Sequence, residues 1–437
     1  MFFERKEEGK VHKGSVLVGY DLGDDFSQIS YCIFGEEDVE SVATVVGTKQ
    51  YNIPTVLCKR KGINQWFYGK DALKNCGEDG TLVTNLVEAA KKGEMLSIEE
   101  EEYDPIALLT LFLKRSLTLM SFIATIENID ALMFTVDNLD DRMVEVLAKA
   151  AVNLNLKTSR IYFQSHTESF YYFVLHQPEE LWQYQVLACE HNGKRLKTYR
   201  LEANKKTTPI VVLIEEQAYN TLVLPGEDEE EAIKKDSYRL ADEKFLDILQ
   251  RQCNDRIVSS AYLLGDGFRD GWAEESLHFL CRNRRVFQGN NLFSKGACYG
   301  LLEKIEPSKA GQEHIFLGPD KLKANIGMNV KRRGKDSYFA LLDAGENWFE
   351  VHKECEFILP GEENKISFVI TPLTGKNAGE QEIILEDAPM RKGAFSRYKM
   401  EMKMLSTECV EVQITDLGFG ELFLSTGKVW IKQFNVV

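Results

Sequence analysis

The sequence predicts an α/β fold followed by an all-β domain, and three observations support this prediction. Up to about Ile305, apolar runs of strand length alternate with segments that repeat apolar residues at helical spacing. From Ala324 onward, short runs of strand character are separated by turn residues, and the helical period is almost absent. At 437 residues the chain is also too long for a single hydrophobic core. We therefore expect two or three domains.

Composition and charge narrow the functional classes. The chain is 44% hydrophobic and 28% charged, as in ordinary globular proteins. Its net charge of −15 argues against nucleic acid or an anionic membrane as the main partner, because both require a positive surface. The N-terminus has no apolar signal-peptide core, so we expect a cytoplasmic protein. The nine cysteines include no C-x-x-C pair, which favours reduced thiols over disulfides or a zinc site.

After a charged tail at 1–13, residues 16–30 are predicted to form a strand, a turn and a second strand. Asp21 ends the first strand and Gly23 lies in the turn. Such a turn can direct backbone N–H groups at a phosphate, with Gly23 allowing close approach and Asp21 free to hold a hydrated cation. An ordinary β-hairpin has the same pattern, so the interpretation depends on the segments that follow.

The rest of the first half alternates strands and helices. We expect strands near 41–46, 129–136 and 160–163, and helices at 82–96, 103–126, 140–154 and 167–176. Two short motifs, I-P-T-V and Y-G-K-D-A, lie between the first hairpin and the first helix.

The second half opens with a hairpin at 185–202, where Asn192-Gly193 predicts a type I′ turn. A strand at 210–215 and a helix at about 242–254 follow. The strand that begins near Val258 runs into the glycine turn Gly265-Asp266-Gly267, and a K-G-A motif follows downstream. Glycines at such a turn let the backbone pack closely against a ligand.

Taken in order, these motifs resemble the actin-like ATPase superfamily, and specifically DnaK-type chaperones. The motif G-Y-D-L-G at 19–23 is similar to the first phosphate loop of that family. I-P-T-V and Y-G-K-D-A are similar to its I-P-S and I-G-D-A-A landmarks, and the Gly265 turn is similar to its adenosine motif L-V-G-G-S-T-R. The resemblance implies a two-lobed, ribonuclease-H-like ATPase domain at 14–305, with lobe I at 14–180 and lobe II at 181–305.

A linker is expected at 306–322, and the tract 323–437 resembles the substrate-binding β-sandwich of the same chaperones. No helical segment follows the sandwich, which predicts a lidless domain. About eight strands are expected, at 324–330, 337–342, 348–350, 365–373, 379–385, 397–404, 408–415 and 420–424.

The resemblance also implies a site for ATP or ADP with Mg²⁺. Asp21 and Glu190 take the catalytic positions, and Asp21 is also the expected metal ligand. The nucleotide-binding positions are Gly23, Asp24, Asp25, Gly193, Lys194, Gly265, Asp266 and Gly267.

Several positions depart from the family pattern. A glutamate that helps to position metal and water falls on Ser165, and the second carboxylate of the later phosphate hairpin falls on Lys197. Asp24 and Asp25 replace two threonines, so their charges would repel phosphate unless Asp21 and Asp24 share a divalent cation.

These departures predict a DnaK-like protein with a degenerate ATP cleft, at most a weak ATPase, that binds a protein or peptide partner. Two alternatives remain open at this point. One is a weakly active chaperone ATPase, and the other is a scaffolding protein whose cleft holds nothing.

Overall fold

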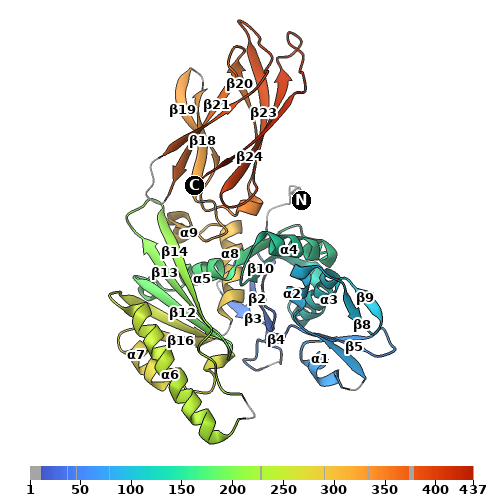
Figure 1. Ribbon diagram of the computed structural model, residues 1–437, viewed down its shortest axis with the longest axis vertical. Coiled ribbons are helices and arrows are strands. Elements are labelled where there is room, and N and C mark those ends of the chain that lie inside the picture. Colours follow the sequence, from blue (N-terminus) through green and yellow to red (C-terminus); the bar gives the residue numbers. More distant parts are fainter. Residues whose placement is uncertain are drawn as a thin grey trace. The chain divides into compact units, whose positions relative to one another are not determined.

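The computed structural model describes residues 11–436 except 37, 46, 78, 227–228, 290, 333 and 374–377. The chain divides into two compact units, Met1–His314 and Ile315–Val437. The first unit is mixed α/β and the second consists almost entirely of strands, as Figure 1 shows. The mixed α/β class predicted from the sequence is therefore confirmed. None of the helices in the described part of the chain is long and apolar enough to span a membrane.

The first unit contains a six-stranded sheet whose central strand is β1 (Val16–Leu22). β1 runs antiparallel to its hairpin partner β2 and parallel to β10, and β10 runs parallel to β11. The strand order is β11-β10-β1-β2-β3, with β4 paired to β2. The other strands are β2 (Phe26–Ile33), β3 (Val39–Ser41), β4 (Ile53–Pro54), β10 (Ile129–Val136) and β11 (Ile161–Ser165).

A second six-stranded sheet repeats this plan with β12 (Gln185–His191) as its central strand. β12 runs antiparallel to β13 and parallel to β15, and β15 runs parallel to β16. The order β16-β15-β12-β13-β14 thus matches the first sheet strand for strand, with β17 added beyond β14. The strands are β13 (Leu196–Asn204), β14 (Ile210–Tyr219), β15 (Val258–Leu264), β16 (Arg285–Gly289) and β17 (His314–Phe316).

Helices and short strands complete the first unit. The helices are α1 (Gly69–Asn75), α2 (Leu86–Lys92), α3 (Pro105–Leu117), α4 (Asp141–Leu154), α5 (His166–Leu175), α6 (Glu231–Cys253), α7 (Glu274–Cys281), α8 (Leu292–Ile305) and α9 (Lys309–Glu313). The short strands are β5 (Leu57–Arg60), β6 (Trp66–Tyr68), β7 (Gly80–Val83), β8 (Leu96–Ile98) and β9 (Glu101–Tyr103).

The helix predicted at 82–96 is wrong in extent. Strand β7 ends at Val83, and Asn85 then adopts the left-handed conformation, with φ of 54°, before α2 starts. A residue in that conformation cannot continue a helix, so only one short helix forms there. The helix predicted at 242–254 is longer than expected, because α6 already begins at Glu231.

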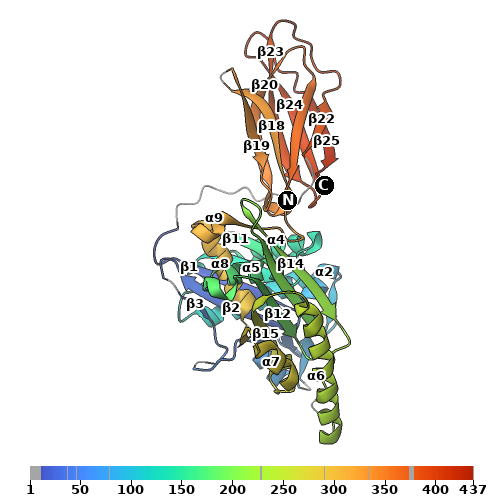
Figure 2. The same cartoon turned by 90° about the vertical axis from the view of Figure 1, so that its left-hand side faces the viewer.

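Helices α5 and α8 each contact the sheet of the other half of the unit (Figures 1 and 2). α8 follows the second sheet, yet its Ala297 and Leu301 pack on Leu17 and Met133 of the first. α5 follows the first sheet, yet its Phe173 contacts the ring of Tyr262 on β15. Each half of the unit is therefore covered in part by a helix from the other.

Glycines allow this crossing to be close. A Cβ on Gly296 of α8 would overlap the backbone carbonyl of Ser169 on α5. A Cβ on Gly19 of β1 would overlap the backbone carbonyl of Ser294 on α8. Because the obstacles are backbone atoms, a side chain at either position requires the elements to move apart.

The second unit is a sandwich of two antiparallel sheets, ordered β19-β18-β21-β22 and β20-β23-β24-β25. Alternate residues of β23 and β24 point inward, and side chains such as Phe368 and Met402 from the two sheets share one core. The strands are β18 (Ala324–Arg332), β19 (Lys335–Leu342), β20 (His352–Pro360), β21 (Lys365–Pro372), β22 (Gly379–Ile384), β23 (Phe395–Met404), β24 (Cys409–Gly418) and β25 (Val429–Asn435).

Two of the predicted sandwich strands are wrong. Residues 348–350 form a turn of 3₁₀-helix, and the strand β20 begins only afterwards. Residues 420–424 are irregular, because Gly418 and Gly420 have φ of 73° and 60° and turn the chain out of the extended conformation. The last strand is β25, which the pattern did not predict.

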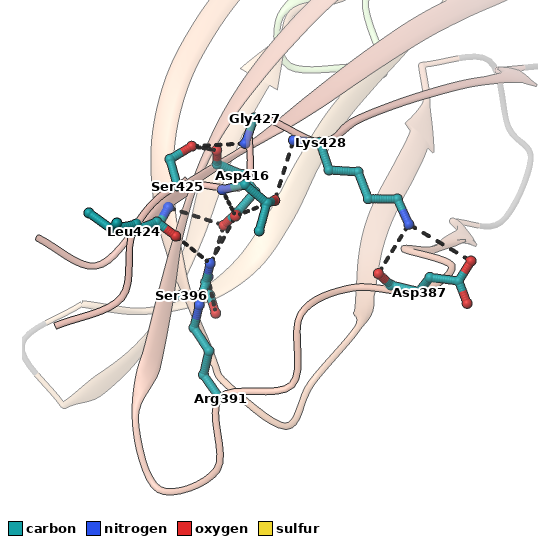
Figure 3. A network of polar contacts seen from close by, with 10 residues as sticks. Asp387, Arg391, Ser396, Asp416, Leu424, Ser425, Gly427 and Lys428 are labelled. Carbon is teal, nitrogen blue, oxygen red and sulfur yellow. Dashed lines mark hydrogen bonds and ion pairs between the residues drawn. The ribbon is translucent and has the colours of Figure 1, made fainter.

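A buried ion pair anchors the irregular segment after β24 (Figure 3). Arg391 donates two hydrogen bonds of 2.8 Å to the two carboxylate oxygens of Asp416, and both side chains are almost completely buried. Thr426 and the backbone of Gly418 also donate to this carboxylate. Burial opposes the charged form, but Arg391 and these donors hold the pKa of Asp416 well below its usual range.

We predict that Asp416→Asn destabilises the second unit by about 3–5 kcal/mol, because Arg391 is left buried without its counterion. Since the folded pKa of Asp416 is depressed, its contribution is present above about pH 4 and is lost as pH falls below that value. The measurement is urea denaturation of the full chain at several pH values, with pulse proteolysis reporting on the 315–437 region. Asp387→Asn is the control, because the Asp387 side chain is exposed. Equal stability of the two variants would contradict the prediction.

We also predict that Gly296→Val destabilises the first unit by about 3 kcal/mol or more, the upper range for overpacking, since the new side chain meets backbone atoms. Gly77→Val is the matched control, because a Cβ at Gly77 has nothing within 4 Å. Far-UV circular dichroism during urea denaturation compares the two. Similar midpoints for both variants would show that α5 and α8 do not need their close approach.

Candidate functional site

A cavity of about 370 Å³ lies in the first unit, lined by residues from both six-stranded sheets. Its size is within the usual range for small-molecule sites. Among the residues predicted from the sequence, those that line the cavity are Asp21, Gly23, Asp24, Asp25, Glu190, Gly265 and Asp266. Gly193, Lys194 and Gly267 do not line it. The structure therefore brings most of the predicted residues together.

Asp21 is paired with a histidine. At the end of β1, its Oδ1 lies 2.8 Å from Nε2 of His166, the first residue of α5. Both side chains are buried, and the His166 ring stacks on Phe293 with centroids 4.0 Å apart and planes 5° apart. Asp21, placed by the sequence as a metal ligand, thus directs a carboxylate oxygen at a histidine.

The surroundings of His166 favour its charged form. Burial lowers its pKa, but the carboxylates of Asp21, Glu190 and Asp137 together raise the pKa to about 9. At neutral pH His166 is therefore a buried cation. Its Nδ1 lies 4.0 Å from Oδ1 of Asp137, beyond hydrogen-bond distance.

Lys197 supplies a second buried cation. It extends from β13 and bonds both Asp137, which follows β10, and Oε1 of Glu216 at 2.8 Å. Burial disfavours the charged amine, but the two carboxylates raise its pKa. The Asp137 side chain is 49% exposed, and its pKa is lowered despite this partial burial, because His166 and Lys197 are close. Lys197 and Asp137 join the two sheets across the cavity.

Glu190, the second predicted catalytic carboxylate, lies at the end of β12 and is half-buried. The hydroxyl of Tyr199 donates to its Oε2 at 2.9 Å. Burial raises the pKa of Glu190, and the nearby cation of His166 only partly offsets this effect. Glu190 therefore accepts a tyrosine hydrogen bond within the same group of charges.

Asp24 caps a helix. Its Oδ1 accepts hydrogen bonds from the backbone N–H groups of Val87 and Glu88, at 3.1 and 3.0 Å, in the first turn of α2. Burial raises the pKa of Asp24, and these two donors counteract the rise. Asp24 and Asp25 are both exposed residues, so it is the capping bonds that distinguish them. The Asp24 charge is partly compensated by the helix terminus.

The glycine turn after β15 packs against a histidine of the chain itself. A Cβ on Gly265, whose φ is 89°, would overlap the backbone carbonyl of His191, and one on Gly267 would overlap the His191 ring. At Gly267, the space next to the backbone that was expected for a nucleoside is thus occupied by the ring of His191. Burial lowers the pKa of His191, which accepts from the N–H of Gly193 at 3.0 Å.

The hairpin between β12 and β13 is confirmed, but the predicted type I′ turn is wrong. Four residues connect the strands, and of these only Gly193 has a positive φ. The side chain of Asn192 accepts hydrogen bonds from the N–H groups of Lys194 and Arg195, which stabilises a longer turn. As a result Arg195 lines the cavity, while Lys194 is exposed outside it.

A chain of amides crosses the cavity. Gln28 on β2 donates to the side-chain oxygen of Asn52 at 2.6 Å, and Asn52 donates to Asp266 at 2.9 Å. Asp266 also pairs with Arg269 at 2.7 Å. The first sheet is thereby hydrogen-bonded to the glycine turn of the second.

Sequence reasoning gave no site role to several important residues, namely Gln28, Asn52, Asp137, His166, Lys197 and Phe293. One signal was available, since Asp137 and His166 each directly follow a strand that runs parallel to β1 or to its neighbour. Side chains after parallel strands meet at one edge of a sheet, as Asp21 does. Phe293 and Asn52 carry no such signal.

The Mg²⁺ implied by the family resemblance does not fit these residues. The carboxylates that would coordinate it already face His166 and Lys197. Within the described ranges, no group of three or more His, Cys, Asp or Glu side chains is arranged to hold a metal ion. Octahedral coordination of Mg²⁺ by oxygen would require these cations to move away.

Comparison with known proteins gives two family matches. Residues 38–319 match the C-terminal part of a family of unknown function, DUF5716. Residues 321–436 match a domain of unknown function, DUF8552. No curated protein matches the chain. The boundary between the two matches lies close to the division after His314.

We predict that Asp24→Ala destabilises the first unit by about 1 kcal/mol, the usual effect of removing a side-chain cap from a helix N-terminus. Asp25→Ala is the matched control at the adjacent exposed carboxylate and should change stability by less than about 0.5 kcal/mol. Urea denaturation of the full chain measures both. Equal effects would show that the capping bonds contribute nothing.

Proposed function

Because the chain belongs to the DUF5716 family of unknown function, we propose a function from the geometry of its cavity. The protein is a DnaK-like pseudo-ATPase of actin-like fold. It binds a nucleotide or a similar phosphorylated ligand without hydrolysing it, and its β-sandwich binds a protein or peptide partner. The cytoplasm is the expected location.

The repeated sheet plan supports the fold part of this proposal. Each sheet has a central strand with an antiparallel hairpin on one side and two parallel strands on the other. Two such sheets in succession are what a duplicated, ribonuclease-H-like ATPase domain requires. Helices α5 and α8 pack against each other, and this packing forms the contact between the two halves.

The single observation that carries the ligand-binding proposal is the composition of the cavity wall. The turn after β1, the hairpin after β12 and the glycine turn after β15 all contribute, and they are distant in sequence. These are the three segments that the family resemblance associates with phosphates and nucleoside. Arg195, from the hairpin, adds an exposed positive charge to the wall.

The side-chain contacts of the carboxylates in the cavity oppose hydrolysis of a bound nucleotide. Phosphoryl transfer to water requires carboxylates that hold a metal and orient the attacking water. Asp21 faces His166, Glu190 accepts from Tyr199, and Asp137 bonds Lys197. We call these three carboxylates, with His166 and Lys197, the cavity floor. Each of the three carboxylates is bonded by another side chain.

The partner part of the proposal is supported by the second unit. Leu422 and Leu424 are each 79% exposed, in the irregular segment after β24. Arg391 holds that segment through Asp416 and the backbone carbonyl of Leu424 (Figure 3). Neighbouring exposed apolar side chains are a feature of protein-binding surfaces, and the ion pair keeps this segment in place.

The proposal predicts that ADP binds the full chain and that ATP turnover does not exceed background. Arg195→Gln should weaken ADP binding about tenfold or more, because it removes a charged hydrogen-bond donor worth about 1.5–3 kcal/mol. Lys194→Gln is the matched control, since Lys194 is adjacent but outside the cavity. Isothermal titration calorimetry measures binding and phosphate release measures turnover.

Two outcomes would overturn the proposal. Turnover that disappears in Asp21→Asn would indicate an active ATPase. If neither ADP nor ATP binds, the cavity is that of a scaffolding protein, and the amide chain from Gln28 to Asp266 would then serve only to join the two halves.

A further inference from the structure

Three carboxylates meet at the floor of the cavity, and two basic side chains lie among them. Asp21, Asp137 and Glu190 come from the ends of β1, β10 and β12. His166 lies 2.8 Å from Asp21, and Lys197 bonds Asp137. The basic groups thus contact the oxygen atoms that a divalent cation would need.

Both basic groups are held firmly. His166 is 6% exposed, begins α5 and stacks on Phe293, so its ring cannot turn away without disturbing α8. Lys197 is 7% exposed and is held between Asp137 and Glu216. The side chains are therefore fixed parts of the cavity floor.

A metal ion near Asp21 would meet two obstacles. It would have to displace the Nε2–H group of His166 that bonds the carboxylate. To use Asp137 as a second ligand, it would also have to compete with the ammonium group of Lys197, which already bonds that carboxylate. Like charges repel strongly where water is largely excluded. Mg²⁺ also gives up its hydration water reluctantly, so a site already filled by side chains competes poorly for it.

We infer that His166 and Lys197 take the place of a divalent cation, so that the cavity excludes metal and binds its phosphorylated ligand without one. The ligand part of this inference rests on the proposed function. The exclusion of metal is a property of the chain alone and is tested separately.

The first experiment uses Mn²⁺ as the probe, detected by electron paramagnetic resonance on the full chain. Wild type and Asp21→Asn should bind Mn²⁺ equally, because Asp21 is not a ligand in either. Combining His166→Gln with Lys197→Gln frees the carboxylates of Asp21 and Asp137 and should strengthen Mn²⁺ binding at least about tenfold. Adding Asp21→Asn to that double variant should abolish the gain.

The wild-type comparison decides the inference even if the double variant does not fold. Mn²⁺ binding by wild type that is lost in Asp21→Asn would overturn it. A folded double variant that gains no affinity for Mn²⁺ would also overturn it. Circular dichroism establishes which variants are folded.

The second experiment measures ADP binding with excess Mg²⁺ and with excess EDTA. Equal affinity in the two buffers is expected, and ADP binding that requires Mg²⁺ would overturn the inference. Absence of ADP binding in both buffers defeats the proposed function instead, and the Mn²⁺ comparison then decides the exclusion of metal.

Discussion

The crossing of α5 and α8 is the constraint on which the cavity depends. Gly296 brings the backbones of the two helices together at Ser169. The same crossing brings His166, the first residue of α5, against Phe293 at the start of α8. The position of a charged group on the cavity floor is therefore a direct consequence of how two helices pack, and the packing requires a glycine.

The cavity is also where the two halves of the first unit are joined by polar contacts. Lys197 of the second sheet bonds Asp137, which follows a strand of the first. Asn52 donates across the cavity to Asp266. The Lys197 ammonium group is buried while the Asp137 side chain is 49% exposed. Desolvation of Lys197 offsets much of the attraction between the two groups, and removal of Asp137 would leave a buried charge with one partner fewer. The main effect of this pair is therefore to select one arrangement of the two halves, and its net contribution to stability is small.

Much of the fold could be predicted, because hairpins and buried strands leave local patterns. Asp21 was identified as a carboxylate at a strand end and Glu190 through the family resemblance, and the structure places both at the cavity. The role of Asp24 could not be predicted, since the amide groups it caps lie 63 and 64 residues away in sequence. The turn at Asn192 was misjudged because its side chain satisfies two backbone N–H groups and so favours a longer loop.

The charges of the cavity floor form one unit. If catalytic residues had simply been replaced, unpaired carboxylates would remain in a cavity that shields them poorly from one another, and their repulsion would be costly. Instead Asp21 is hydrogen-bonded to His166, Asp137 is paired with Lys197, and Glu190 accepts a hydrogen bond from the hydroxyl of Tyr199. The carboxylates in turn compensate the charges of the basic residues, because an unpaired buried cation is also unfavourable. The family resemblance expects a metal-positioning glutamate at Ser165, next to His166, and a second carboxylate at Lys197. On our proposal these two departures are physically a single change, because the cavity holds internal cations in place of an external one.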